Sequence, residues 1–249
     1  MNRALVILPT LNESEVIRDV VSSILDQSFA LPIRILVVDD DSPDGTAELV
    51  RQTFRNDPRV EVLQRRGKPR GLVPSLNDAI ASADEDFLIW LDADQQMPAE
   101  VLPLILEKNL RAGVSAVVGT RFLPGGGDLR DRGKSDSILI VHRHLSRCLN
   151  LLVPAFLWIP GTDFTSGLIS IRRRDLPGRL LQGQHGEYFI ELMHELYARR
   201  LRVVEHPYEL QDRPRGVSKS TGNSWSTLVR TGLRYLFVIG RLYFGKRLR

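Results

Sequence analysis

Asp92 and Asp94 follow directly on the apolar run 87–91, and the amide of Gln96 comes two positions later. Such a run is long enough for a buried parallel strand, and residues at i and i+2 of an extended chain point the same way. Both carboxylates are therefore expected to face one point beyond a strand's carboxyl end, where open α/β sheets bind ligands. Because close carboxylates repel unless a cation lies between them, we expect a divalent metal with a phosphate-bearing ligand. The alternative is that the two acids solvate a strand end and cap the next helix.

Acidic residues also follow two other apolar runs. Glu13 lies beyond the first run, although Asn12 and Glu15 have the spacing of a capping box, which would explain the acids here without a ligand. The carboxylates 39–41 end the second run. Residues 42–44 have the types that begin a helix, but capping does not explain three successive acids. We expect at least one of the three to accept hydrogen bonds from a ribose hydroxyl or a base.

The order of apolar runs and helical periodicities predicts the framework that carries these acids. Strands are expected over 3–8, 33–38, 60–63, 87–91 and 116–119, each followed by a helix or a polar loop. This alternation favours a doubly wound, mainly parallel α/β sheet, with Arg121 at a further strand end. The basic loop 64–71 could cradle phosphate, or it could be a solvated connection. Beyond residue 122 we expect helices over 138–152 and 187–199, and strands over 168–171 and 203–204.

Composition sets limits on the class of protein. The chain has 249 residues, 43% of them hydrophobic and 26% charged, which is typical of a globular protein with a sizeable core. Its single cysteine, Cys148, excludes an intramolecular disulfide and a cysteine cluster for zinc. The run before Pro9 is too short for a signal peptide, so a cytoplasmic location is expected.

The charge is unevenly distributed. The formal net charge is +4, but residues 213–249 contain nine Lys or Arg and no Asp or Glu, so the rest of the chain is acidic. A basic tail on an acidic body predicts an anionic partner such as phospholipid, nucleic acid or a phosphorylated substrate.

Residues 225–244 are aromatic and apolar, interrupted by Arg230, Arg234 and Arg241. In a helix these arginines fall within roughly 40° of one another. The apolar face expected opposite them consists of Leu228, Leu233, Leu236, Val238, Ile239, Leu242 and Tyr243. A spanning helix would bury an arginine at a cost of about 2.5 to 3.5 kcal/mol. We therefore expect a helix that lies on a membrane surface; the alternative is packing on the protein's own body or on an integral membrane subunit.

Six segments in this order resemble the inverting glycosyltransferases of family 2, most closely the polyprenol (dolichol) phosphate mannosyltransferases. The segments are 9–13 (PTLNE), 37–46 (VVDDDSPDGT), 91–96 (LDADQQ), 119–121 (GTR), 163–167 (DFTSG) and 213–219 (RPRGVSK). The resemblance implies a GT-A fold over residues 1–222, with a nucleotide-sugar-binding half at 1–122 and an acceptor-binding half at 123–222. Residues 223–249 form the basic, membrane-associating tail.

The resemblance also implies roles for individual residues. The nucleoside would be held by Pro9, Leu11, Glu13, Val38 and Asp40. The ribose and diphosphate side would be met by Asp92 and Ala93, and Mg²⁺ or Mn²⁺ by Asp94 and Gln96. The diphosphate and the acceptor phosphate would be met by Arg121, Arg213 and Lys219. The sequence departs from the family at Met97, where histidine is usual, and near His142 and Arg143, where the register of the usual arginine is ambiguous.

The chemistry that fits is metal-assisted transfer of a hexose, mannose first, from GDP-mannose to a polyprenyl phosphate. The sequence offers no convincing general base, and a phosphate monoester, already ionised near pH 7, can attack the anomeric carbon without one. Asp92, Asp94, Arg121 and Arg213 are the expected catalytic residues. The enzyme would lie on the cytoplasmic face of a membrane.

Two other interpretations stay open. One keeps the fold but takes UDP-glucose or UDP-N-acetylglucosamine as donor, or a saccharide hydroxyl as acceptor. The other is a nucleotide or nucleic-acid binding module whose basic tail contacts phosphates. Because acids gather at three strand ends, we expect no nucleic-acid partner.

Overall fold

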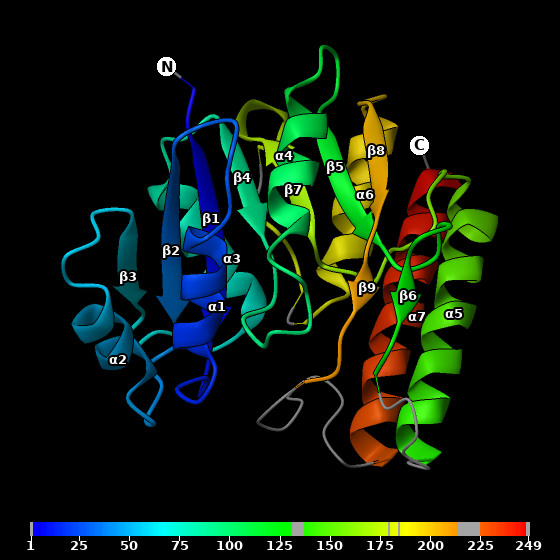
Figure 1. Ribbon diagram of the computed structural model, residues 1–249. Helices are drawn as coiled ribbons and strands as arrows, with labels where there is room; N and C mark the ends of the chain where they lie inside the picture. The colour runs from blue at the N-terminus through cyan, green and yellow to red at the C-terminus, as the bar shows by residue number, and fades with distance from the viewer. Residues whose placement is uncertain (1, 131–136, 179, 184, 214–224, 248–249) are drawn as a thin grey trace.

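A seven-stranded sheet forms the centre of the protein (Figure 1). The computed structural model describes residues 2–130, 137–178, 180–183, 185–213 and 225–247. The sheet has the order β3-β2-β1-β4-β7-β5-β8. Its strands are β1 (Ala4–Thr10), β2 (Ile33–Asp39), β3 (Val60–Gln64), β4 (Phe87–Trp90), β5 (Ala116–Thr120), β7 (Ile169–Arg172) and β8 (Val203–Pro207). The short strands β6 (Gly127–Asp128) and β9 (Glu209–Leu210) pair with each other beside it.

The predicted mainly parallel sheet is confirmed, and it contains one antiparallel strand. β1 pairs in parallel with β2 and β4, β2 with β3, and β5 with β8. β7 lies between β4 and β5 and is antiparallel to both. The parallel strands therefore bring the acidic segments after β1, β2 and β4 to the same edge of the sheet.

Helices cover both faces of the sheet, as expected for a doubly wound fold. The helices are α1 (Ile17–Leu25), α2 (Thr46–Thr53), α3 (Leu72–Ser82), α4 (Val101–Leu110), α5 (Ser137–Leu157), α6 (Tyr188–Ala198) and α7 (Trp225–Arg247), with a 3-10 turn η1 (Arg173–Asp175). One hydrophobic cluster joins the sheet to α1, α2 and α4, and the other joins it to α3, α5, α6 and α7. Alternate residues of β1, such as Val6 and Ile7, enter opposite clusters because a strand points its side chains to both faces.

Two predicted helix starts are wrong. α2 begins at Thr46, because the Ser42 hydroxyl donates to Asp39 (2.5 Å) and the Asp44 carboxylate accepts from the backbone N–H of Thr46 (3.0 Å). α1 begins at Ile17 with no side-chain cap. Asn12 instead has a left-handed backbone (φ +54°), and so the predicted capping box is absent.

The tail is helical, and its apolar residues divide between two faces. α7 packs against α5 and α6, and Figure 1 shows α5 and α7 side by side, running in the same direction. Val238 and Ile239 are buried in this contact, and Arg241 pairs with Glu191 of α6 at 2.5 Å. Leu233 and Leu236 are exposed. The apolar face predicted for the tail is therefore divided: part of it packs on the protein's own body, which was the alternative expectation, and part of it is exposed. Within the described residues, no helix combines the length and the hydropathy needed to cross a membrane.

Candidate active site

The segment after β4 carries the two predicted carboxylates into a tight turn. Gln95 has a left-handed backbone (φ +62°), and the N–H of Gln96 donates to Asp94 Oδ1 at 3.1 Å. Asp94 is 5% exposed, and its Oδ2 accepts a hydrogen bond from Nη2 of Arg213 at 2.5 Å. The segment is also tied to residue 211, because Gln96 Nε2 donates to the Gln211 carbonyl (3.1 Å) and the Gln211 N–H donates to the Gln96 carbonyl (2.8 Å). The acidic turn and residues 211–213 thus form one unit.

Asp92 is solvent-accessible but closely surrounded by protein atoms. Loss of hydration among these surrounding atoms, together with the negative charge of Asp94, raises the pKa of Asp92 to about 7. Arg213 opposes the shift, Glu13 adds to it, and Arg121 opposes it more weakly. The structure therefore brings Glu13, Asp92, Asp94, Arg121 and Arg213 within electrostatic reach of one another, with negative charge in excess around Asp92.

The acids after β2 are largely satisfied by the protein itself. Asp39 is fully buried and accepts hydrogen bonds from Thr10 Oγ1 (3.2 Å) and from Ser42. Asp40, 3% exposed, pairs with Arg65 and accepts from the Gly71 N–H at 2.5 Å. The expected nucleoside contact of Asp40 stays a prediction.

The basic loop 64–71 serves this buried ion pair. Arg65 also donates to Asp78 (2.8 Å) and to the Pro69 carbonyl (3.0 Å). Its guanidinium is 3% exposed, so this arginine supports Asp40 and does not line a phosphate cradle.

Arg121 is held by a bidentate ion pair at the end of β5. Its Nε and Nη2 donate to the two carboxylate oxygens of Asp163 at 2.7 and 2.8 Å, and Nη2 also donates to Thr165 Oγ1 at 2.7 Å. Burial favours the uncharged form of Arg121, but the charge and hydrogen bonds of Asp163 outweigh it and raise the pKa above its ordinary value. Arg121 is thus a fixed positive charge near the acidic turn, with Nη1 outside this ion pair.

Other predicted residues divide by accessibility. Pro9, Leu11 and Glu13 are partly exposed beyond β1. The side chains of Val38 and Ala93 are buried, one in each hydrophobic cluster, so they pack in the core beneath the site and do not line it. Lys219 lies outside the described residues.

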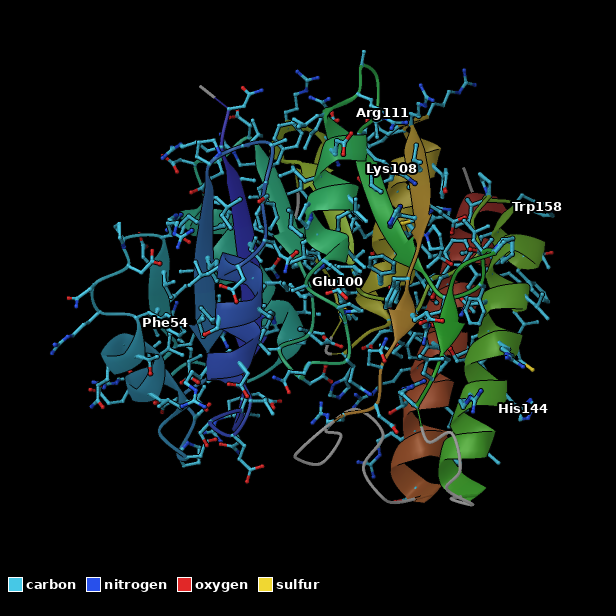
Figure 2. The ribbon with its side chains drawn as sticks, viewed as in Figure 1. Phe54, Glu100, Lys108, Arg111, His144 and Trp158 are labelled. Atoms are coloured by element: carbon cyan, nitrogen blue, oxygen red, sulfur yellow. The ribbon has the colours of Figure 1, made fainter. Side chains whose placement is uncertain are left out.

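A pocket of about 370 Å³ adjoins the acidic turn. It is lined by Val20, Ser23, Ile24, Leu91, Asp92, Gln95, Met97, Pro98, Ala99, Glu100, Gln211 and Asp212. In Figure 2, Glu100 marks the start of α4 at the active-site edge of the sheet, while Lys108 and Arg111 mark its far end. Of the predicted site residues that the structure describes, only Asp92 lines this pocket, so the expected nucleoside residues lie outside it.

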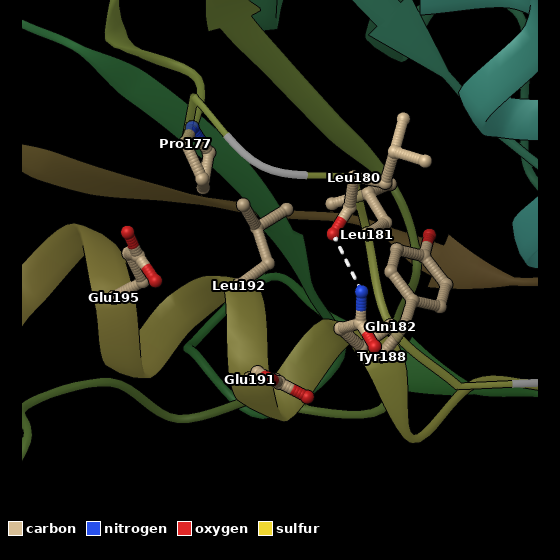
Figure 3. A pocket seen from close by; sticks show the side chains of 8 residues that line it. All are labelled: Pro177, Leu180, Leu181, Gln182, Tyr188, Glu191, Leu192 and Glu195. Carbon is tan, nitrogen blue, oxygen red and sulfur yellow. Dashed lines mark hydrogen bonds between the residues drawn. The ribbon is translucent and has the colours of Figure 1, made fainter.

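A second pocket lies between α6 and the preceding loop (Figure 3). Its volume is only about 10 Å³, and Leu180, Leu181, Tyr188, Glu191 and Leu192 are among its lining residues. A space of this size holds at most a single water molecule, so it is not a substrate site.

The donor set of the acidic turn fits a hard divalent cation. Asp92 and Asp94 offer carboxylate oxygens, and Gln96 has its amide oxygen left because its nitrogen is bound to Gln211. In the part of the chain that the structure describes, no group of three or more His, Cys, Asp or Glu surrounds a metal-sized space. Mg²⁺ needs only a few protein ligands when phosphate oxygens and waters complete its coordination.

Several contributors escaped the sequence analysis. Asp163 was named only within the segment 163–167 that resembles the family, without a role of its own, and its pairing with Arg121 spans 42 positions. The hydroxyl of Tyr188 accepts a hydrogen bond from the indole Nε1 of Trp90 at 2.8 Å. The negative charge of Asp92 also acts on this hydroxyl and helps to raise its pKa. Aromatic residues on helices carry no local signal for such a role, because most of them are ordinary core residues.

The sheet and its acidic edge define a GT-A-like fold. Two solved structures of glucosyl-3-phosphoglycerate synthase from Mycobacterium tuberculosis share the fold. The complex with Mn²⁺, UDP and glucosyl-3-phosphoglycerate has a TM-score of 0.68 at 18% identity, covering 97% of this chain and 80% of that one. The UDP complex has a TM-score of 0.71 at 17% identity, with the same coverage of both chains.

The chain belongs to glycosyltransferase family 2, whose model matches residues 5–177. It is 29% identical to a dolichol-phosphate mannosyltransferase of Pyrococcus furiosus over 223 residues, which are 88% of this chain and 59% of that protein. It is 31% identical to a polyprenol monophosphomannose synthase of Mycolicibacterium smegmatis, covering 89% of this chain and 82% of the relative. It is also 31% identical to an undecaprenyl-phosphate mannosyltransferase of Micrococcus luteus, covering 88% of each chain. The predicted family and class of enzyme are confirmed: the protein is a glycosyltransferase.

Proposed function

We propose that this glycosyltransferase transfers mannose from GDP-mannose to a polyprenyl phosphate. The names of three relatives, each matched over more than four fifths of this chain, support the mannosyl group and the polyprenyl phosphate acceptor. The observation that carries the proposal is the contact between Asp94 and Arg213. It joins a carboxylate suited to a metal to a cation suited to phosphate, and an enzyme acting between two phosphate-bearing substrates needs both at one point.

Asp94 and Gln96 would hold Mg²⁺ or Mn²⁺, with Asp92 on the ribose and diphosphate side. The cation would supply charge neutralisation to the leaving diphosphate. Arg213 now shares its charge with Asp94. In the loaded site its guanidinium would turn to phosphate oxygens, for which arginine's planar fork is suited. Arg121, fixed by Asp163, would add positive charge on the acceptor side.

The reaction forms a bond between the anomeric carbon and an oxygen of the acceptor phosphate. It breaks the bond from that carbon to the diphosphate, which leaves with the bonding electrons. Attack from the face opposite the leaving group inverts the anomeric configuration. Because the acceptor phosphate is already ionised, no proton needs removing, and the protein's task is alignment and charge stabilisation.

Other substrates within the family are a second candidate. The solved structures that share the fold contain UDP or UDP-glucose, which favours testing UDP-glucose and UDP-N-acetylglucosamine as donors. A saccharide hydroxyl as acceptor would demand a general base, which makes it the weaker choice.

A lipid acceptor also places the enzyme at a membrane. We propose that it acts peripherally on a cytoplasmic membrane face, either directly on the lipid or beside an integral membrane subunit. The absence of acidic residues from 213–249 supports contact with an anionic surface.

The experiment is a donor panel with purified protein, Mn²⁺ and a polyprenyl phosphate in detergent. GDP-mannose, UDP-glucose and UDP-N-acetylglucosamine are compared by mass spectrometry of the lipid product. Mannosyl phosphoryl lipid from GDP-mannose alone is expected. Preference for a UDP-sugar would replace the donor assignment, and no glycolipid from any donor would overturn the proposal.

A further inference from the structure

An apolar stripe remains uncovered along the outer side of α7. It consists of Val229, Leu233, Leu236, Phe237 and Phe244, which are 48% to 70% exposed. At 100° per residue these five positions fall within roughly 100° of the helix circumference, and they extend over about 22 Å of its length. Val238 and Ile239, which are buried, face the protein body. The stripe is therefore a second face of the helix, separate from the one that holds it in the fold.

The stripe is continuous with exposed aromatic rings at the end of α5. The Tyr243 ring lies 5.2 Å from that of Phe244, 5.9 Å from Phe156 and 6.0 Å from Trp158, measured between centroids. Trp158, just after α5, is 65% exposed. Figure 2 shows it projecting away from the protein body, as does His144 in the first half of α5. Large aromatic side chains with one apolar and one polar end are enriched where proteins meet the headgroup region of a membrane.

Charge distinguishes this side of the molecule from the rest. Neither α5 nor α7 contains an acidic residue. Arg241 is paired with Glu191 of α6. Arg230 and Arg234 lie within roughly 40° of each other, next to the stripe. This position lets their stems lie along apolar surface while the guanidinium groups reach anionic groups beside it.

We infer that the outer face of α5 and α7, comprising the α7 stripe, its flanking arginines and the aromatic rings around Tyr243, docks on the surface of an anionic lipid bilayer. The stripe supplies insertion to headgroup depth and the arginines supply charge complementarity. A second copy of the chain fits poorly, because a self-complementary contact would place one acid-free face against another. The inference deepens the proposed function, since it names the surface on which the lipid acceptor would be met.

The inner side of the same helix reaches the catalytic half of the protein. The hydroxyl of Tyr235 lies directly against Gly186, just before α6, and Arg241 is bound to Glu191. Tyr235 is also within electrostatic reach of Glu187 and, more weakly, of Asp92. A bilayer bound along α7 would therefore lie beside the acceptor half of the active site.

The test is co-sedimentation of the full chain with phosphatidylcholine vesicles and with mixed phosphatidylcholine–phosphatidylglycerol vesicles, both free of protein. Binding to the anionic vesicles is expected, falling with added salt. Leu233→Ser/Phe237→Ser should weaken it by at least about tenfold through lost apolar burial. Arg230→Gln/Arg234→Gln should weaken it by about thirtyfold at low salt. Leu104→Ser, at a 45% exposed leucine of α4, is the matched control and should bind like the wild type.

Circular dichroism and thermal melts establish that each variant is folded. Equal vesicle binding by the wild type and Leu233→Ser/Phe237→Ser would overturn the inference. So would a failure of the wild type to bind either kind of protein-free vesicle, because a lipid surface alone would then not hold this face. Transfer to a short-chain acceptor in detergent is measured in parallel and should be unchanged in Leu233→Ser/Phe237→Ser. Vesicle binding without transfer by the wild type would reject the proposed function while leaving the docking face intact.

Discussion

Arg213 Nη2 donates to Asp94 Oδ2 at 2.5 Å across 119 positions of the chain. The pair joins the acidic turn after β4 to the segment that follows β9. Because Asp94 is 5% exposed and its other carboxylate oxygen accepts the Gln96 N–H, the carboxylate is firmly oriented. A cation or a phosphate entering the site would have to share or replace this contact, so in the proposed reaction the pair would lie between the metal and the phosphate groups of the substrates.

Asp94→Asn should reduce the rate of transfer by about 10²- to 10³-fold, the usual effect of removing one preorganised group that stabilises developing charge. Initial rates at saturating donor measure this. Asp57→Asn, at a surface acid that pairs with Arg59 away from the site, is the control and should leave the rate unchanged. A rate for Asp94→Asn within threefold of the wild type would show that the Asp94 carboxylate does not stabilise the transition state.

Asp92 predicts a pH dependence of stability in protein stripped of divalent ions. Its pKa of about 7 in the folded protein lies above the value of about 3.9 in an unfolded chain. Between these values the folded state holds a proton that unfolding releases, so this carboxyl lowers stability as the pH rises from about 4 to about 7.

Asp92→Asn removes this ionisable carboxyl and with it the predicted loss of stability between about pH 4 and pH 7. With EDTA present, its melting temperature should exceed that of the wild type near neutral pH and match it near pH 4. Added Mn²⁺ should narrow the difference by stabilising the ionised wild-type carboxylate. A constant difference across the pH range would contradict the raised pKa.

The Arg121–Asp163 pair predicts a large stability effect. Asp163→Asn leaves the buried guanidinium without its counter-charge and should cost about 3 to 5 kcal/mol in the free energy of unfolding. Asp84→Asn breaks a surface pair with Arg3 and should leave the free energy of unfolding nearly unchanged, because water and salt screen exposed charges. Urea titrations of both variants provide the comparison. Similar costs would show that Asp163 is not the structural anchor of Arg121.

The dependence of donor binding on a divalent metal can be measured as a change in melting temperature. GDP-mannose should raise the melting temperature more with Mn²⁺ than with EDTA, because the diphosphate and the acidic turn would share the cation. This gain should be lost in Asp94→Asn and retained in the control Asp57→Asn. An equal donor-induced shift with and without Mn²⁺ would exclude a bridging metal.

The sequence predicted the strands well, because β1, β2 and β4 are mainly apolar runs with acids at or shortly after their carboxyl ends. It gave no sign of the antiparallel placement of β7, since pairing with both β4 and β5 depends on contacts distant in the chain. The start of α2 was misplaced for a related reason. The Ser42 hydroxyl, a good cap by type, is used by Asp39 instead.

The site was predictable where side chains follow strands and less so where they come from later segments. Asp92 and Arg121 both lie at the expected edge of the sheet, but nothing near Arg121 in the sequence indicates Asp163 as its partner. Periodicity revealed the amphipathic tail without showing which side faces the body. Ile239 is buried while Leu233 is exposed, and only the packing of α7 against α5 separates them.

The most direct measurement compares a polyprenyl phosphate with the corresponding polyprenol as acceptor for GDP-mannose in the presence of Mn²⁺. The alcohol lacks the ionised oxygen that would act as nucleophile without a general base. Mannosyl lipid should form from the phosphate, with inverted anomeric configuration, and should not form from the alcohol. Transfer to the alcohol, or retained configuration in the product, would contradict attack by the acceptor phosphate.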